Sequence, residues 1–227
     1  MREAAAPAGG LSRATIVEAA VALADEEGLE AVSIRRVAAA LKARPMSLYP
    51  HIGSKDDLID LMIDAVVRES LLPEPIPSGW REALVAIADH SRAACLRHPW
   101  IAAAHSRRSS LGPHSLRHFE QSLAAVASLD VSDERRVAIL TATDTYTMGH
   151  VTFELVERET LRRNRLTASA WQEAKHAYVT RTAAEGGFPH LAALTATDAA
   201  FAPTDHDARF AEGLNWLLDG IAAQLAA

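Results

Sequence analysis

The sequence predicts an all-α protein, and three observations support this fold class. Of the 227 residues, 49% are hydrophobic and only 5% are aromatic, and much of the apolar share is alanine, which favours helices over strands. Apolar residues recur three and four positions apart in most segments, as they do on the buried face of a helix. We find no segment in which apolar and polar residues alternate as in a β-strand.

The first two helices are predicted from their capping residues and apolar stripes. Ser12 suits the N-cap of a helix that ends at Gly28. Ser33 suits the N-cap of a second helix over residues 34–41, whose apolar side chains share one face. The basic side chains of the second helix lie off that face, so we expect them to point toward solvent.

A short third segment and a longer fourth helix follow. Pro45 suits the first position of a helix because it lacks an N–H, and the segment is predicted to run to about His51. Pro50 disfavours helical geometry at the residue before it, so we expect this helix to end early. Ser54 and the acidic residues after it predict the start of a fourth helix, residues 55–72, which serves as a connector.

The remainder is predicted to consist of helices with short loops. Three prolines within residues 72–79 must interrupt a helix, so this stretch is the expected joint between two modules. The helices expected beyond it cover residues 80–98, 99–105, 114–129, 132–159, 167–185 and 206–225. Residues 195–205 are expected to be irregular.

The charge distribution separates a basic segment from an acidic remainder. The whole chain carries −6, which by itself gives no indication of a nucleic-acid partner. Residues 33–55, however, hold five Lys and Arg residues and no Asp or Glu. Such an acid-free basic segment in an acidic protein predicts a local anionic partner. The alternative is a chance run of basic residues on the surface.

The cellular setting is predicted from cysteine content and hydropathy. Cys95 is the single cysteine, so the chain has no internal disulfide and no cysteine-based zinc site, which suits a reducing compartment. No run of about 18 apolar residues is present to span a bilayer. Residues 1–11, rich in Ala, Pro and Gly, are expected to form a flexible tail rather than a signal peptide. We therefore expect a cytoplasmic protein without a membrane partner.

A helix-turn-helix DNA-binding motif consists of a helix, a short turn and a second short helix, with basic residues on the exposed side. Here Leu48 and Ile52 are expected to face inward. The side chains presented to DNA would then be Arg44, Pro45, Met46, Ser47 and Tyr49. Spacing alone is weak support, since many pairs of helices share it.

Three consecutive segments closely resemble the DNA-binding domain of tetracycline-repressor (TetR) family regulators: SIRRVAAAL at 33–41, PMSLYPHI at 45–52 and GSKDDL at 53–58. The resemblance implies that Ser47 and Tyr49 contact bases or phosphates. It implies that His51 and Lys55 bind phosphates, and that residues 44–46 determine which operator is read. The other predicted DNA-binding residues are Ser33, Arg35 and Arg36. For Tyr49 the alternative is a packed aromatic ring with its hydroxyl in water.

The larger module resembles the C-terminal domain of the tetracycline-repressor subgroup at residues 79–84, 96–100 and 111–116 and in the long helix. That long helix has two apolar faces, which predicts burial on two sides. The last helix has one apolar stripe, with Gly213 and Gly220 placed where backbones can approach closely. Two such helices from each of two chains would form a four-helix homodimer interface, the arrangement that the family uses. The alternative is that both are core helices of a monomer.

Aromatic and polar residues set among the apolar ones of this module are the candidates for a ligand site. The predicted ligand-binding residues are Trp100, His105, Phe119, Asp144, Tyr146, His150, Phe153 and Glu154. For each of them alone, ordinary core packing is the alternative. His114 and His118 have a spacing that suits a metal, but exposed histidines are commoner, and we expect neither a metal nor a cofactor.

Together these features predict a transcriptional repressor that a small molecule releases from its operator. The expected partners are double-stranded operator DNA, a small-molecule effector of unknown identity and a second copy of the chain. The expected domains are a helix-turn-helix domain at 12–58 and a ligand-binding and dimerisation domain at 59–227. One alternative is a helical small-molecule-binding protein without DNA binding. An enzyme is not expected, because the sequence lacks the phosphate-loop, zinc-protease and nucleophile-elbow motifs.

Overall fold

The computed structural model describes residues 10–105, 111–195 and 201–226, and in these ranges every regular element is a helix. The all-α fold class is therefore confirmed. The predicted tail, residues 1–11, lies almost entirely outside the described residues. None of the helices in the described ranges combines the length and the apolar character that crossing a membrane requires.

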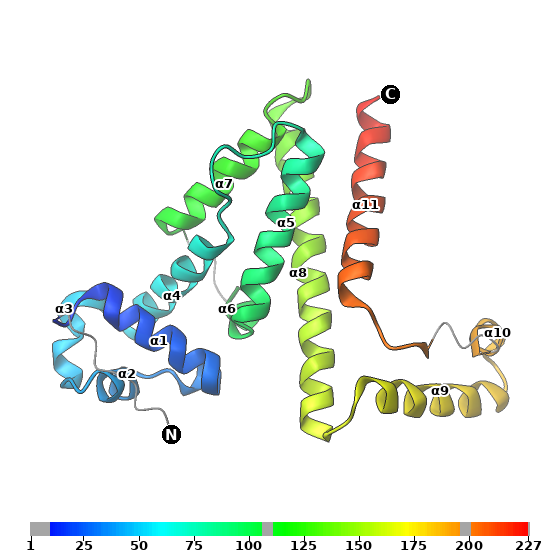
Figure 1. Ribbon diagram of the computed structural model, residues 1–227, viewed down its shortest axis with the longest axis horizontal. Helices are drawn as coiled ribbons and strands as arrows, with labels where there is room; N and C mark the ends of the chain where they lie inside the picture. Colours follow the sequence, from blue (N-terminus) through cyan, green and yellow to red (C-terminus); the bar gives the residue numbers. More distant parts are fainter. Residues whose placement is uncertain (1–9, 106–110, 196–200, 227) are drawn as a thin grey trace. The chain divides into compact units, whose positions relative to one another are not determined.

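Figure 1 labels the α-helices in chain order, and two short 3₁₀ helices lie between them. The elements are α1 (Arg13–Glu27), η1 (Leu29–Ala31), α2 (Ile34–Ala40), η2 (Pro45–Ser47), α3 (Tyr49–Ile52), α4 (Lys55–Ser70), α5 (Trp80–Arg97), α6 (Trp100–His105), α7 (Pro113–Val126), α8 (Asp133–Asn164), α9 (Ala168–Ala184), α10 (Pro189–Thr195) and α11 (His206–Leu225).

The predicted N-caps of α1, α2 and α4 are confirmed. The hydroxyl oxygens of Ser12, Ser33 and Ser54 accept hydrogen bonds from the backbone N–H three residues later, at 3.2, 3.3 and 3.0 Å. Each cap satisfies a backbone donor that the first turn of a helix leaves without a partner. Gly28 ends α1 as expected, with a φ of 86° that favours glycine.

The recognition segment differs from the single helix predicted over residues 45–51. It consists of η2 and the four-residue α3, which continues to Ile52. The expectation that Pro50 ends this helix early is wrong. Pro50 occupies the first turn of α3, where its missing N–H costs no helical hydrogen bond. The two prolines therefore divide the segment into two short helical pieces.

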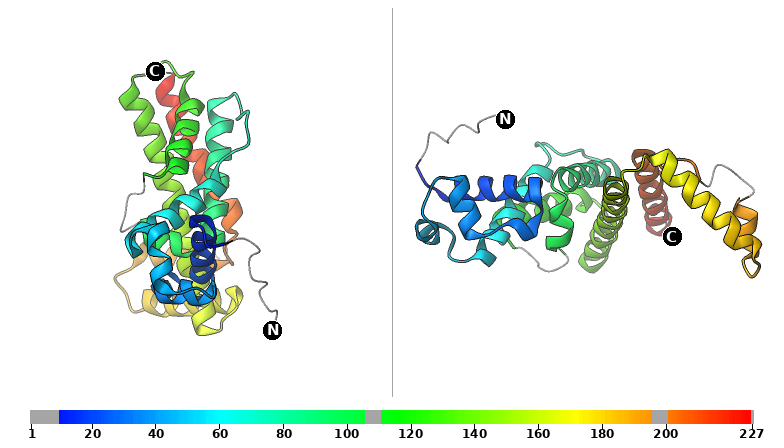
Figure 2. Two further views of the ribbon diagram at one scale, coloured as in Figure 1. Left: turned by 90° about the vertical axis from the view of Figure 1, so that its left-hand side faces the viewer. Right: turned by 90° about the horizontal axis from the view of Figure 1, so that it is seen from below.

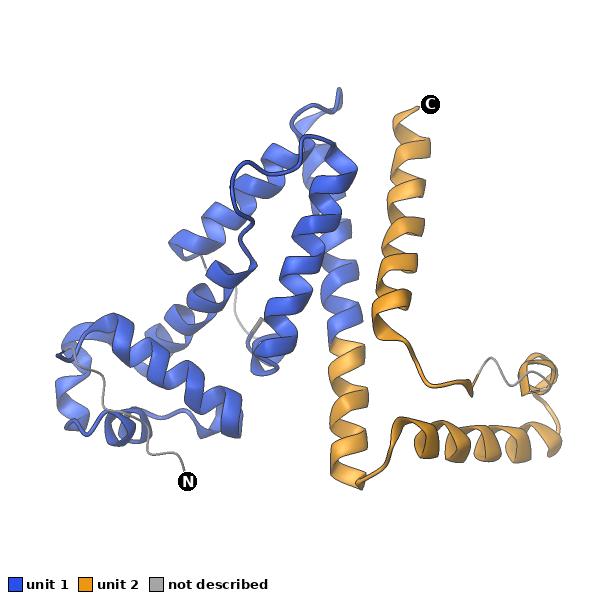
Figure 3. Cartoon of the chain, viewed as in Figure 1, with its two compact units in different colours: residues 1–151 blue, residues 152–227 orange. Residues whose placement is uncertain are grey.

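The chain forms two compact units, residues 1–151 and 152–227 (Figure 3). In the first unit α1, α2 and α3, drawn in blue shades, lie together in all the views of Figures 1 and 2. There α4 contacts α1 and α3 as well as α5, α6 and α7. The boundary between units falls inside α8, whereas the predicted domain boundary at residue 58 concerns function and stays a prediction.

The second unit contains α9 and α10, which contact each other, and α11. The ring of His176 on α9 stacks on Phe201 at 4.4 Å. Helix α10, which begins at the end of the Gly-Gly-Phe-Pro sequence at 186–189, is not among the helices predicted from the sequence. Pro189 in fact begins a new helix, which is the position that proline favours.

Candidate DNA-binding surface and ligand cavity

The recognition segment presents its polar side chains outward on a fixed apolar base. Leu48 and Ile52 are buried beneath it, as the sequence predicts. Met46 is 74% exposed and Tyr49 is 41% exposed, and Arg44, Pro45 and Ser47 are exposed as well. The buried pair sets the orientation of η2 and α3, so the exposed residues form one surface.

Hydrogen bonds hold this surface in place. Arg13 of α1 donates from Nε to the carbonyl oxygen of His51 at 2.9 Å. The Ser47 hydroxyl donates to the carbonyl of Arg44 at 2.7 Å, which leaves its lone pairs free to accept. Gly53 has a φ of 70°, and a Cβ there would lie 2.6 Å from a carboxylate oxygen of Asp57. The turn between α3 and α4 therefore requires glycine.

The cations around the recognition segment divide into paired and unpaired ones. Arg36 is bonded through both terminal nitrogens to the carboxylate of Glu27, and this guanidinium holds the pKa of Glu27 below its usual range. Within the described part of the chain, Arg35, Arg44 and Lys55 form no such pair. Arg36 is thus the weakest of the predicted phosphate contacts, because its charge is already compensated.

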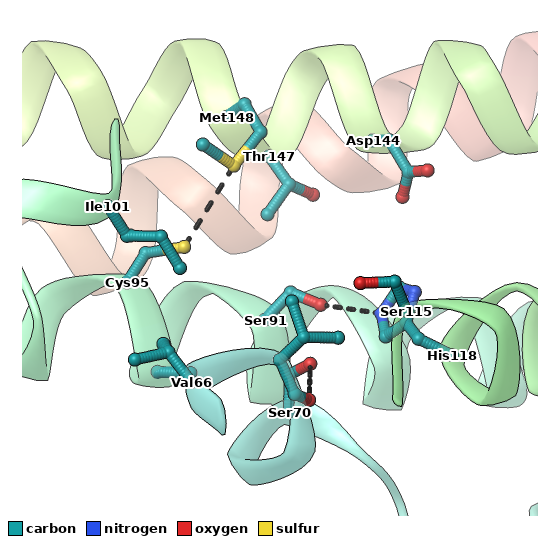
Figure 4. Close-up of a pocket in the computed structure, with 12 residues that line it drawn as sticks. Val66, Ser70, Ser91, Cys95, Ile101, Ser115, His118, Asp144, Thr147 and Met148 are labelled. Carbon is teal, nitrogen blue, oxygen red and sulfur yellow. Dashed lines mark hydrogen bonds between the residues drawn. The ribbon is translucent and has the colours of Figure 1, made fainter. Parts of the chain in front are cut away.

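A cavity of about 340 Å³ lies in the first unit, between α4, α5, α6, α7 and α8 (Figure 4). Its apolar wall includes Val66 of α4, Ala94 of α5, Ile101 of α6 and Met148 of α8. Hydroxyl groups and one carboxylate, that of Asp144, interrupt this wall. A largely apolar hollow with a few polar groups is the usual form of a small-molecule site.

The polar groups of the cavity differ in whether they have partners. His118 Nε2 lies 3.1 Å from the Ser91 hydroxyl, and the Cys95 sulfur lies 3.9 Å from that of Met148. Burial raises the pKa of the Cys95 thiol to about 11, so it is neutral at physiological pH. His114, the other histidine of the suggested metal pair, bonds to Asp64 instead. The structure thus gives the two histidines separate partners.

The Asp144 carboxylate has no hydrogen-bond or ion-pair partner among the described residues. The residue is exposed to solvent, but neighbouring protein atoms partly desolvate its carboxylate. This desolvation raises the pKa of Asp144 to about 6. Figure 4 shows it on α8, across the cavity from Ser115 and His118 of α7.

Of the predicted ligand-binding residues whose side chains the structure describes, Asp144 alone lines this cavity. Trp100 is buried elsewhere in the core, where its indole N–H donates to Asp25 of α1 at 2.8 Å. Phe119 and Phe153 are exposed on the surface. His105 belongs to α6, but its side chain lies outside the described residues.

The remaining predicted ligand residues lie on α8, and none of them lines the cavity. Tyr146 and His150 place their rings 6.1 Å apart. Glu154 is fully buried and forms an ion pair with Arg158 one turn away. The three belong to other faces of α8, because the cavity receives only one face of this helix.

Sequence reasoning missed the cavity residues near Asp144. Thr147 and Met148 follow it at the third and fourth positions, so they share its helix face. Ser91 and Cys95 are likewise four apart on α5. This spacing was visible in the sequence, but only the packing of α5 against α8 makes the two faces one wall.

Asp64 of α4 joins the DNA-binding side of the first unit to α7. Its buried carboxylate accepts hydrogen bonds from the backbone N–H groups of His114 and Ser115, both at 3.0 Å, and from the Ser115 hydroxyl at 3.3 Å. Its second oxygen lies 2.7 Å from Nδ1 of His114. Asp64 therefore caps α7 from another helix. A Cβ on Gly112 would lie 2.1 Å from this carboxylate, so glycine is needed there.

A second connection joins α1 to the start of α6. His98 is buried, with Nδ1 at 2.8 Å from Asp25 of α1 and Nε2 at 3.3 Å from Glu69 of α4. The indole of Trp100 donates to the same Asp25 oxygen. Polar contacts of Asp64 and Glu69, both in the C-terminal half of α4, thus link α1 and α4 to helices that form the cavity.

Comparison with known proteins agrees with this arrangement. The family model described as "Bacterial regulatory proteins, tetR family" matches residues 16–62. The model described as "Tetracyclin repressor-like, C-terminal domain" matches residues 72–225. The two matches cover the recognition segment and the cavity helices.

Individual relatives match along most of the chain. The "HTH-type transcriptional repressor DrrR1" of Streptomyces coeruleorubidus is 37% identical over 213 residues, covering 93% of this chain and 77% of the relative. An "HTH-type transcriptional regulator" of Saccharopolyspora erythraea is 35% identical over 213 residues, covering 94% and 85%. The structure of the TetR family protein ActR from Streptomyces coelicolor, in complex with actinorhodin, superposes with a TM-score of 0.78 at 30% identity, covering 96% of this chain and 100% of that one.

Members of this family are not enzymes; they bind operator DNA, dimerise and bind small-molecule effectors. The family models, the relatives and the geometry agree, and the chain therefore belongs to the TetR family and is a ligand-responsive, DNA-binding regulator of transcription.

Proposed function

We propose that the chain represses transcription by placing residues 44–55 of each subunit of a homodimer on operator DNA, and that a small molecule in the cavity releases it. The observation that carries this proposal is the recognition surface itself. Tyr49 and Ser47 are exposed on a segment that the buried Leu48 and Ile52 anchor. In the sequence, the unpaired cations Arg44 and Lys55 flank this segment. Such a surface supplies base contacts flanked by phosphate contacts.

The connection between ligand and DNA runs along α4. Lys55 is its first residue and lies at the DNA-binding end, while Val66 and Ser70 near its other end line the cavity. Asp64 ties the same helix to α7, whose Ser115 and His118 also line the cavity. A ligand that favours another arrangement of α4 and α7 changes the spacing of the two recognition helices, which must lie about 34–36 Å apart to meet successive major grooves.

Operator binding is expected to depend steeply on salt. Arg35, Arg44 and Lys55 supply three unpaired cations in each subunit, and a dimer that neutralises six phosphates releases a matching number of counterions. We expect the protein's affinity for the DNA upstream of its own gene to fall about 1,000-fold between about 50 and 200 mM salt. Fluorescence anisotropy with labelled duplex measures this, with an unrelated duplex as control. A flat salt profile would rule out phosphate contact by this segment.

We assign the dimer interface to α8 and α11. Phe153 and Val156 of α8 are exposed one turn apart, and Trp216 of α11 is 68% exposed. A Cβ on Gly220 of α11 would meet open space. Exposed apolar side chains on two helices suit a partner surface, and four such helices form the bundle used by this family.

Charges placed on that surface are expected to separate the subunits. The Phe153→Asp, Trp216→Asp double variant should weaken dimerisation at least about 100-fold, because buried aromatic residues carry most of the energy of an interface. Size-exclusion chromatography with light scattering gives the mass directly. The Phe119→Asp variant, also exposed but on α7, should stay dimeric. A dimeric double variant would place the interface elsewhere.

The location and domain limits follow from this function. A repressor must reach DNA, so we place the protein in the cytoplasm. We assign residues 12–58 to DNA recognition and residues 59–227 to ligand binding and dimerisation, with 55–72 as the connector. The complex of ActR with actinorhodin supports a small-molecule effector for this chain, since that protein matches it along its length.

A further inference from the structure

We propose that the effector carries a cationic group, such as a protonated amine, which pairs with Asp144 while an apolar ring system fills the cavity between α4, α5 and α8. This inference deepens the proposed function, because it takes the cavity as the effector site. It follows from the charge and partners of the groups that line the cavity, as set out below.

Asp144 carries the one carboxylate among the described residues that line the cavity. Asp64 accepts four hydrogen bonds and Asp25 accepts two, but no described residue bonds to the Asp144 carboxylate. A ligand that fills the cavity displaces water from this exposed carboxylate, and a carboxylate withdrawn from water without a partner is unfavourable. A cationic ligand offsets that cost, whereas a neutral ligand does not.

The other lining groups do not suit an anion or a divalent metal. The described lining residues include no lysine and no arginine, so an anionic ligand would meet Asp144 without a compensating charge. They also include no second carboxylate. Calcium and magnesium take six or more oxygen ligands, which this wall does not supply. An organic cation needs only one carboxylate.

The apolar part of the cavity indicates the rest of the ligand. Val66, Ala94 and Ile101 form aliphatic walls, and the sulfurs of Cys95 and Met148 lie side by side. Polarisable sulfur packs well against aromatic rings. The volume of about 340 Å³ lies at the lower end of the range for drug-sized ligands. A compact aromatic body with one amine therefore fits both the shape and the charge.

Two other titratable groups line the cavity with Asp144. Cys95 of α5 stays neutral, because burial raises the pKa of its thiol to about 11. His118 of α7 is hydrogen-bonded to Ser91. Burial raises the pKa of Asp144 to about 6, so the carboxylate is charged above that pH and becomes neutral below it. A preference for cations should therefore be present at neutral pH and be lost as the pH falls through about 6.

The test uses the full-length protein and three naphthalenes that carry an aminomethyl, a hydroxymethyl or a carboxylate group at the same ring position. Isothermal titration calorimetry gives the dissociation constant of each. At about pH 7.5 we expect the amine to bind at least about tenfold more tightly than the alcohol, and the carboxylate to bind most weakly. At about pH 5 the amine and the alcohol should bind alike.

The Asp144→Asn variant should bring the amine and alcohol affinities within about twofold of each other at neutral pH and leave the alcohol unchanged. The control is Glu134→Gln, which removes an exposed charge from the same helix and should keep the wild-type preference. No amine binding by the wild type, or an amine preference retained by Asp144→Asn, would overturn the proposal.

Release of operator DNA by the amine is measured separately by anisotropy. Preferential amine binding without any change in DNA affinity would contradict the proposed function, because the cavity would then not be the effector site. It would leave the cation site itself standing. If the wild type showed no preference for the amine but still bound its operator, the cation site would be contradicted. The proposed function would then still stand.

Discussion

The Tyr49→Ala, Lys55→Ala double variant is expected to bind operator DNA at least about 100-fold more weakly than the wild type. Tyr49 is exposed on the recognition segment, and Lys55 begins α4, where its charge adds to the positive end of the helix dipole. In a dimer each of the two subunits loses both contacts, so four contacts are lost. At about 1 kcal/mol for each lost contact, four contacts amount to a thousandfold change, so a hundredfold loss is a conservative expectation.

Anisotropy with labelled upstream duplex measures this loss, and the salt profile separates its two parts. Removing Lys55 should reduce the salt slope by about one for each subunit, while removing Tyr49 should leave the slope unchanged. Both side chains are exposed, so the circular dichroism spectrum should match that of the wild type. Lys175→Ala, which removes an exposed cation from α9, should leave the affinity as it was. An affinity within about threefold of wild type would refute the assignment of these two residues.

The Asp64→Ala variant is expected to lower the free energy of unfolding by about 3 kcal/mol, the largest stability effect that we predict. The substitution removes four hydrogen bonds and leaves two backbone N–H groups at the start of α7 without their acceptor. It also separates α4 from α7. Ligand binding to the cavity should therefore weaken DNA binding less in this variant than in the wild type.

Urea unfolding at fixed protein concentration measures the stability change. His114→Ala serves as the graded control, because it removes only the side-chain bond to Asp64 and keeps both backbone bonds. Its imidazole is 38% exposed, so we expect a loss below about 1 kcal/mol. Gly112→Ala should resemble Asp64→Ala, since the new Cβ would displace the carboxylate. Equal stability of the Asp64→Ala and His114→Ala variants would show that the backbone bonds contribute nothing.

The features predicted correctly from the sequence are those that depend on neighbouring residues. Ser12, Ser33 and Ser54 each cap a helix as expected, because the cap and its donor lie three positions apart. Leu48 and Ile52 turned inward for the same kind of reason, since their spacing places them on one helical face. Motif resemblance then identified the family, which the comparisons confirm.

The cavity was predicted poorly because it depends on how distant helices pack. The sequence predicts Trp100 as a ligand contact, yet its indole N–H donates a hydrogen bond to Asp25, which lies 75 positions earlier. Asp64 is not among the residues singled out from the sequence, because its role depends on Gly112 and on the N-terminus of α7. Asp144 was identified, but its lack of a partner is a property of the folded chain alone. No local pattern contains this information.

The most direct test of DNA recognition is selection of binding sites from random duplex DNA by the full-length protein. We expect enrichment of one inverted repeat, with half-sites about one helical turn apart, and no enrichment by the Tyr49→Ala, Lys55→Ala variant. Selection of no common sequence by the wild type, or of the same repeat by the variant, would contradict operator reading by residues 44–55.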